Sequence, residues 1–77
     1  MKINVDDYSP KDIIRIIRDH TDLTQKEFGK TINKSERTIQ NYEGGLANYS
    51  FALLLEIAKK HNIDITISTK EKPNKNF

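Results

Sequence analysis

The sequence contains no cysteine and no tryptophan, and its longest apolar run is the five residues Phe51–Leu55. Without cysteine, the chain forms neither a disulfide nor a cysteine-based zinc site, and we expect no metal and no cofactor. The apolar run is far too short to cross a membrane, and residues 1–7 lack the hydrophobic stretch of a secretory signal. We therefore expect a cytoplasmic protein that does not bind membranes.

An excess of charge of one sign is also absent, because 13 basic and 11 acidic side chains leave a net charge of +2. Acidic residues concentrate before residue 23, and the segments 24–45 and 59–77 are mildly basic. Such a distribution permits a polyanionic partner without requiring one. The short chain allows one domain, which we place at residues 1–68, followed by a polar, disordered tail over 69–77.

Four segments carry capping residues followed by apolar residues at helical spacing. The expected helices extend from Ser9–Pro10 to about His20, from Thr24 to Asn33, from Ser35 to Glu43, and from Ser50 to about Asn62. In the first helix Ser9 is the expected cap, and Asp12 is placed to complete a capping box. The side chains that we assign to the core are Phe28, Phe51, Leu54 and Ile57. His20 and His61 have no ligand partners at metal-binding spacing, so we interpret them as structural.

Beyond residue 62 the apolar period changes from 3.6 to 2, which predicts a β-strand over Ile63–Ile67. A shorter strand is expected over Ile3–Val5. Because a lone strand leaves its backbone groups unpaired, we expect these two strands to pair, either within one chain or across a dimer. In the second case the edge of Ile63–Ile67 forms the dimer interface.

The two short helices joined by residues 33–35 form a helix-turn-helix candidate. On a helical wheel of the second of these helices, Ile39 and Tyr42 lie on the inward side. The opposite side holds Glu36, Arg37, Gln40 and Asn41. Arginine, asparagine and glutamine donate bidentate hydrogen bonds to base edges, and glutamate accepts from cytosine. The competing interpretation is an ordinary solvated helix face.

Residues 23–45, Leu-Thr-Gln-Lys-Glu-Phe-Gly-Lys-Thr-Ile-Asn-Lys-Ser-Glu-Arg-Thr-Ile-Gln-Asn-Tyr-Glu-Gly-Gly, resemble the helix-turn-helix of the Cro/phage-repressor type, also called the XRE family. The resemblance covers about residues 9–63. It implies a mostly helical, repressor-like bundle of four or five helices, with the helix-turn-helix over residues 24–43 and the third helix in the DNA major groove. Gly29 stands where the family usually has alanine, at a cost of about 1 kcal/mol in helix propensity.

The resemblance also implies a role for individual residues. The implied base contacts are Glu36, Arg37 and Asn41, with Gln40 more peripheral. The implied phosphate contacts are Gln25, Lys34, Ser35, Asn48 and Tyr49. Arg18 and Glu43 match a pair that often forms an internal salt bridge, and the inward flank position of Glu43 independently calls for a partner.

These patterns predict a small prokaryotic or phage transcriptional regulator, of the repressor type, that binds double-stranded DNA as a homodimer. We expect no catalytic activity, because the sequence has no nucleophile–base pair, metal cluster or phosphate loop. No small-molecule ligand is evident. The alternative is an antitoxin or a coactivator-like module that uses the same fold to hold a protein partner.

Overall fold

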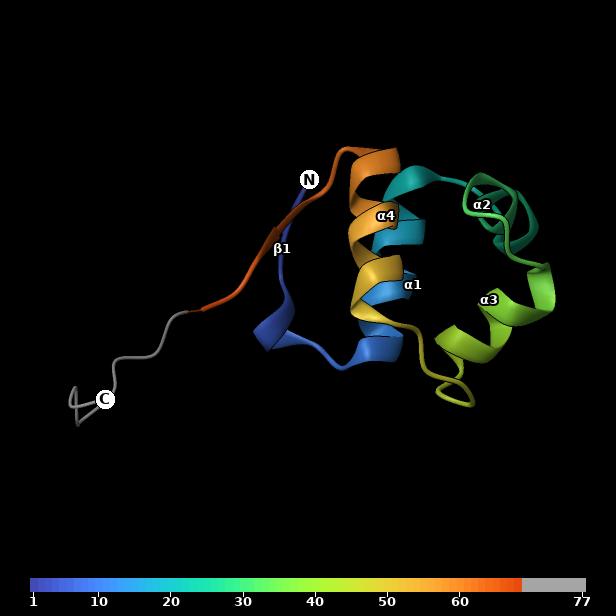
Figure 1. Cartoon of the computed structure of the whole chain (residues 1–77), viewed down its shortest axis with the longest axis horizontal. Helices are drawn as coiled ribbons and strands as arrows, with labels where there is room; N and C mark the ends of the chain where they lie inside the picture. Colours follow the sequence, from blue (N-terminus) through green and yellow to red (C-terminus); the bar gives the residue numbers. More distant parts are fainter. Residues whose placement is uncertain (69–77) are drawn as a thin grey trace.

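The computed structural model describes residues 1–68, and the tail expected over residues 69–77 lies outside the described residues. The elements in chain order are β1 (Lys2–Asn4), a 3-10 turn (Val5–Asp7), α1 (Pro10–Thr21), α2 (Gln25–Thr31), α3 (Glu36–Glu43), α4 (Phe51–His61) and β2 (Asp64–Thr66). Figure 1 shows the four helices of this part of the chain gathered together, with the strands along one side. The predicted mostly helical fold is confirmed.

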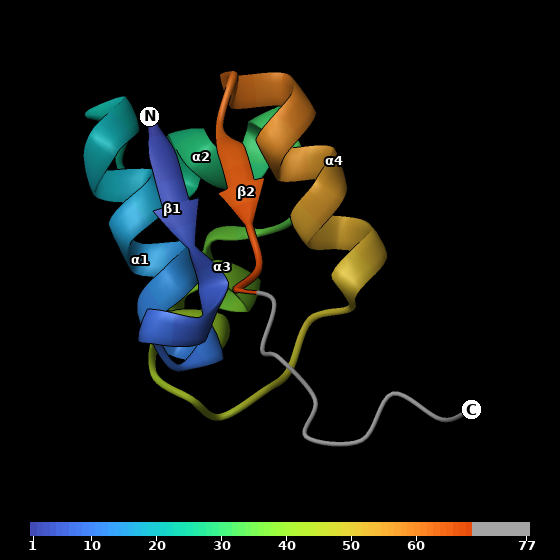
Figure 2. The ribbon, with the colours of Figure 1, turned by 90° about the vertical axis from the view of Figure 1, so that its left-hand side faces the viewer.

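The two strands form a parallel pair within a single chain, with Ile3 opposite Ile65. Figure 2 shows them side by side, with α1 beside β1 and α4 beside β2. Ile3 and Ile63 are buried in the core, Ile65 packs against it, and Ile67 is 61% exposed. The apolar face of the second strand is therefore used mainly to close the chain on itself.

The first strand is shifted by one residue from the predicted Ile3–Val5, and the second is shorter than the predicted Ile63–Ile67. The first ends at Asn4, whose side chain accepts a hydrogen bond from the backbone N–H of Asp6, and this bond begins the 3-10 turn at Val5. The second ends at Thr66. Beyond it the backbone N–H of Ser68 donates to the Asp6 carboxylate over 2.9 Å, so side-chain bonds replace the strand ladder.

Local capping signals explain where three of the helices begin. The Thr24–Glu27 capping box is complete, and the hydroxyls of Ser35 and Ser50 each accept from the third backbone N–H of their helix. Ser9 differs, because its carbonyl already accepts the N–H of Asp12 and its hydroxyl donates to the Asp12 carboxylate over 3.0 Å. The predicted side-chain cap at Ser9 is wrong.

Residues with a left-handed backbone conformation end α1 and α4, and another lies in the turn after α2. Asp22, Asn33 and Asn62 have φ angles of 60°, 60° and 55°. Asparagine and aspartate tolerate this conformation better than most residues. Because the left-handed residue is Asp22, α1 continues to Thr21, slightly past the end that the sequence predicts.

The core lies between the helices and the buried side of the strand pair. Its largest fully buried side chains are Phe28, Ile14, Ile17, Ile39 and Ile57. The predicted burial of Phe51 is wrong, since its side chain is 56% exposed. Phe51 is the first residue of α4 and lies about 60° around the helix from Leu54, at the edge of the stripe that packs inward.

Candidate nucleic-acid interface

The close packing of α2 against the turn that precedes α3 depends on Gly29. The backbone N–H of Lys34 donates to the Gly29 carbonyl over 2.8 Å, and Gly29 is buried. A Cβ atom at this position would overlap the carbonyl oxygen of Lys34. The small residue expected to allow a close approach of the third helix therefore has a second role, because the contact that leaves no room for a Cβ atom is with the backbone of the turn at Lys34.

The helix α3 has one buried side and one side whose polar side chains have no partner within residues 1–68. Ile39 and Tyr42 are buried against the core, and Ser35 caps the helix through the backbone N–H of Thr38 over 3.1 Å. The side chains on the opposite side are those of Glu36, Arg37, Gln40 and Asn41. Asn41 is half-buried and the other three are exposed. Within residues 1–68, none of these four side chains makes a hydrogen bond or ion pair.

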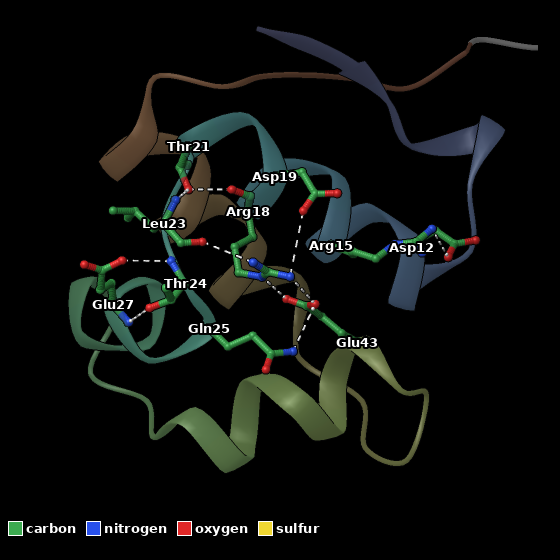
Figure 3. Close-up of polar contacts among 10 residues, drawn as sticks. All are labelled: Asp12, Arg15, Arg18, Asp19, Thr21, Leu23, Thr24, Gln25, Glu27 and Glu43. Atoms are coloured by element: carbon green, nitrogen blue, oxygen red, sulfur yellow. Dashed lines mark hydrogen bonds and ion pairs between the residues drawn. The ribbon is translucent and has the colours of Figure 1, made fainter.

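An ion pair between Arg18 on α1 and Glu43 on α3 holds these two helices together (Figure 3). Arg18 Nε donates to Glu43 Oε2 over 2.6 Å, and Arg18 Nη2 donates to Oε1 over 2.9 Å. The Glu43 side chain is 7% exposed and that of Arg18 is 18% exposed. The hydrogen bond to Glu43 raises the pKa of Arg18 above its usual value. Arg18 and Glu43, which the sequence pairs, thus form a bidentate bridge.

Gln25 extends this bridge to α2. Its Nε2 donates to Glu43 Oε1 over 3.3 Å, so Glu43 contacts side chains from both α1 and α2 (Figure 3). Sequence reasoning missed this bond, because nothing in the local pattern relates a residue at the start of α2 to one at the end of α3. The Gln25 side chain is half-buried, and its position is set by Glu43.

The other residues that the resemblance assigns to phosphate differ in their availability. Lys34 and Asn48 are exposed, and the Ser35 hydroxyl lies 2.9 Å from that of Thr38. Tyr49 packs edge-on against Tyr42, with 5.4 Å between ring centroids, and its hydroxyl donates to the Pro10 carbonyl. Burial raises the pKa of Tyr49 to about 12. A hydroxyl has one hydrogen, so Tyr49 has none left for phosphate in this arrangement.

The described residues offer little for other kinds of site. In residues 1–68 no group of histidine, cysteine and acidic side chains is placed to hold a metal ion. No helix in this part of the chain is long and apolar enough to cross a membrane.

The helix-turn-helix family model matches residues 14–67, which span the last two thirds of α1 and the elements from α2 to β2. No curated protein and no solved structure gives a match to this chain. The matched segment covers well over half of the sequence and contains the turn, the capped α3 and the bridge described above. The chain therefore belongs to the XRE-type helix-turn-helix family, a DNA-binding and typically non-catalytic family.

Proposed function

We propose that this protein is a sequence-specific regulator of transcription that inserts α3 into the major groove of double-stranded DNA. The observation that carries the proposal is the contrast between the two sides of α3. One side is buried through Ile39 and Tyr42, and the other presents four polar side chains with no partner among residues 1–68. A helix of this width fits the major groove, where every base pair presents a distinct donor and acceptor pattern.

Each side chain on the outward side of α3 has a distinct proposed role. Arg37 is suited to the O6 and N7 acceptors of guanine, and Asn41 to the N7 and N6 groups of adenine. Gln40 has the same chemistry as Asn41 at a more peripheral position. Glu36 is repelled by phosphate, so it discriminates among bases rather than adding affinity, by accepting from cytosine N4.

The proposed phosphate contacts surround this helix. One N–H of the Gln25 amide is held by Glu43, which leaves its second N–H available to a phosphate oxygen. Lys34, Ser35 and Asn48 complete the set, from which we omit Tyr49 because its hydroxyl hydrogen is already donated. Contacts with phosphate position a protein on the duplex, whereas contacts with bases specify the sequence.

The direct test is selection of duplexes from a random pool, followed by binding measurements on the selected sequence. A DNA-reading dimer selects a two-fold symmetric motif, with half-sites about one helical turn (~34 Å) apart. The proposal fails if the selected pool carries no motif, or if binding does not weaken steeply as salt is added.

The variant Arg37→Ala should lose about 1–3 kcal/mol of binding free energy on the selected duplex, with relaxed preference at one base pair. Arg15→Ala is the matched control, because Arg15 is an exposed arginine on α1. Gln25→Ala should weaken binding to selected and random duplexes alike. Equal losses on both duplexes for Arg37→Ala would contradict its role as a base contact.

A further inference from the structure

The outer face of α4 is apolar and uncovered by the rest of residues 1–68. Phe51 and Leu55 lie one helical turn apart, with exposed fractions of 56% and 41%. Beside them a hollow of about 550 Å³ is lined by Ala52, Leu55, Glu56, Lys59 and Lys60. Two large apolar side chains next to a hollow on the same helix are costly to leave in water, and such a patch marks an interaction surface.

We propose that this face binds a second copy of the chain, with two α4 helices packed antiparallel about a two-fold axis near Leu55. The ridge formed by Phe51, Leu55 and Lys59 follows the i, i+4 rows through which helices commonly interlock. Antiparallel pairing at Leu55 places Phe51 of one copy opposite Lys59 of the other, where the ring covers the aliphatic stem of the lysine and faces its ammonium. The hollow beside the small Ala52 receives the Leu55 side chain of the second copy.

The position of α4 relative to α3 favours a second copy over an unrelated partner, and this step rests on the proposed function. Figure 1 shows α4 upright and facing the viewer, with α3 to its right and the strands to its left. In Figure 2, a quarter turn away, no helix or strand lies outside α4. A two-fold axis directed from the strands toward α3 makes the α4 helices antiparallel and leaves both α3 helices on the same side. One duplex can then contact both copies.

The charges on α4 are complementary to those of a second α4. Glu56, Lys59 and Lys60 make no ion pair within residues 1–68. In the antiparallel arrangement, Lys59 of the second copy lies opposite Phe51, which is five residues, about 7.5 Å, along the helix axis from Glu56 and in reach of the long lysine side chain. The face carries both signs of charge around an apolar centre, which suits a self-complementary interface and not a strongly charged partner.

The strand Ile63–Ile67 is a weaker candidate for the dimer interface. Ile63 and Ile65 are packed inside the chain and leave Ile67 as the exposed member of the apolar row. Each strand has only three residues, and very short edge strands are one means by which proteins discourage edge-to-edge pairing.

The test is sedimentation equilibrium of the full chain without DNA, so that failure of this proposal leaves the DNA-binding proposal untouched. We expect a reversible monomer–dimer equilibrium, with a dissociation constant raised about tenfold or more by Leu55→Glu. Leu46→Glu is the matched control, because Leu46 is 82% exposed in the α3–α4 loop, and Ile67→Glu tests the strand. Both should associate like the unaltered chain, and circular dichroism checks that every variant is folded.

Charge reversal adds a test that a folding defect cannot imitate. Glu56→Lys and Lys59→Glu should each weaken the dimer, and the double variant should restore it. The proposal is overturned if the unaltered chain remains monomeric at millimolar concentration. It is also overturned if Ile67→Glu, rather than Leu55→Glu, abolishes association, or if the double charge reversal gives no rescue.

Discussion

At the scale of single residues, Glu43 connects the three helices that form and support the candidate interface. It accepts from Arg18 on α1 and from Gln25 on α2, although it lies at the C-terminus of α3. A carboxylate at that end of a helix is repelled by the helix dipole. The arginine offsets this repulsion and the loss of water around the nearly buried carboxylate, so the three side chains depend on one another.

We predict that Glu43→Gln lowers the free energy of unfolding by about 2–4 kcal/mol, because Arg18 keeps its charge and loses its bidentate partner. Urea unfolding measures this loss. Arg15→Gln is the control, since the Arg15–Asp12 pair is exposed and its removal should cost less than about 1 kcal/mol. Similar losses for the two variants would show that the internal bridge contributes no more than a surface pair.

His61 is a second residue whose role depends on its surroundings. Its ring stacks on Phe28 with 5.1 Å between centroids. Thr31 donates its hydroxyl hydrogen to the Phe28 carbonyl, so its oxygen accepts the Nε2–H of His61 over 2.9 Å. Burial, followed by the charge of Lys60, lowers the pKa of His61. The folded state therefore binds a proton less readily than the unfolded chain does.

From this lowered pKa we predict that the free energy of unfolding falls as the pH is lowered below about 6.5. The contribution of neutral His61 is complete above that pH and is lost as the pH falls through the folded-state pKa. Urea midpoints measured between about pH 5 and pH 7.5 test the slope. His61→Gln should flatten it, whereas the exposed His20→Gln should not. An unchanged slope in His61→Gln would refute the assignment.

At the scale of elements, the contact between α2 and the turn explains why α3 begins where it does. Asn33 takes a left-handed conformation, and Lys34 then returns its N–H to the Gly29 carbonyl. This bond brings the backbone of the turn so close to α2 that a methyl group at residue 29 has no room. The glycine is therefore a steric requirement of the turn.

We predict that Gly29→Ala destabilises the protein by about 1–3 kcal/mol, even though alanine has about 1 kcal/mol better helix propensity. Gly44→Ala is the matched control, because a Cβ there lies 3.1 Å from the Gln40 carbonyl oxygen and φ is −88°. Thermal unfolding should show a clearly larger loss for Gly29→Ala. A gain in stability at residue 29 would mean that the turn relaxes without cost.

At the scale of the whole molecule, the sequence predicts what local patterns encode. The caps at Thr24, Ser35 and Ser50 locate three helices, and the change of period after residue 62 locates the second strand. Local patterns do not predict contacts between residues that are far apart in the chain. Pairing of the strands within one chain was one of two open alternatives. The exposure of Phe51 depends on how α4 packs against the other elements, which a helical wheel does not show.

The candidate interface shows the same division. The helical wheel and the resemblance both select the outward residues of α3, because amphipathicity is a local property. The Gln25–Glu43 bond and the use of the Tyr49 hydroxyl by Pro10 depend on three-dimensional neighbours. Such contacts determine whether a polar side chain is free to bind DNA or already has a partner within the protein.

The most direct measurement is a ¹H–¹⁵N NMR titration of the labelled protein with a selected duplex. Our account predicts that the largest shift changes fall on the backbone of α3 and the start of α2, and on the side-chain NH2 groups of Gln40, Asn41 and Gln25. The strands, which lie on the opposite side of the molecule in Figure 1, should change little. Shift changes confined to α4 or to the strands, with α3 unaffected, would contradict the claim that the outward side of α3 contacts DNA.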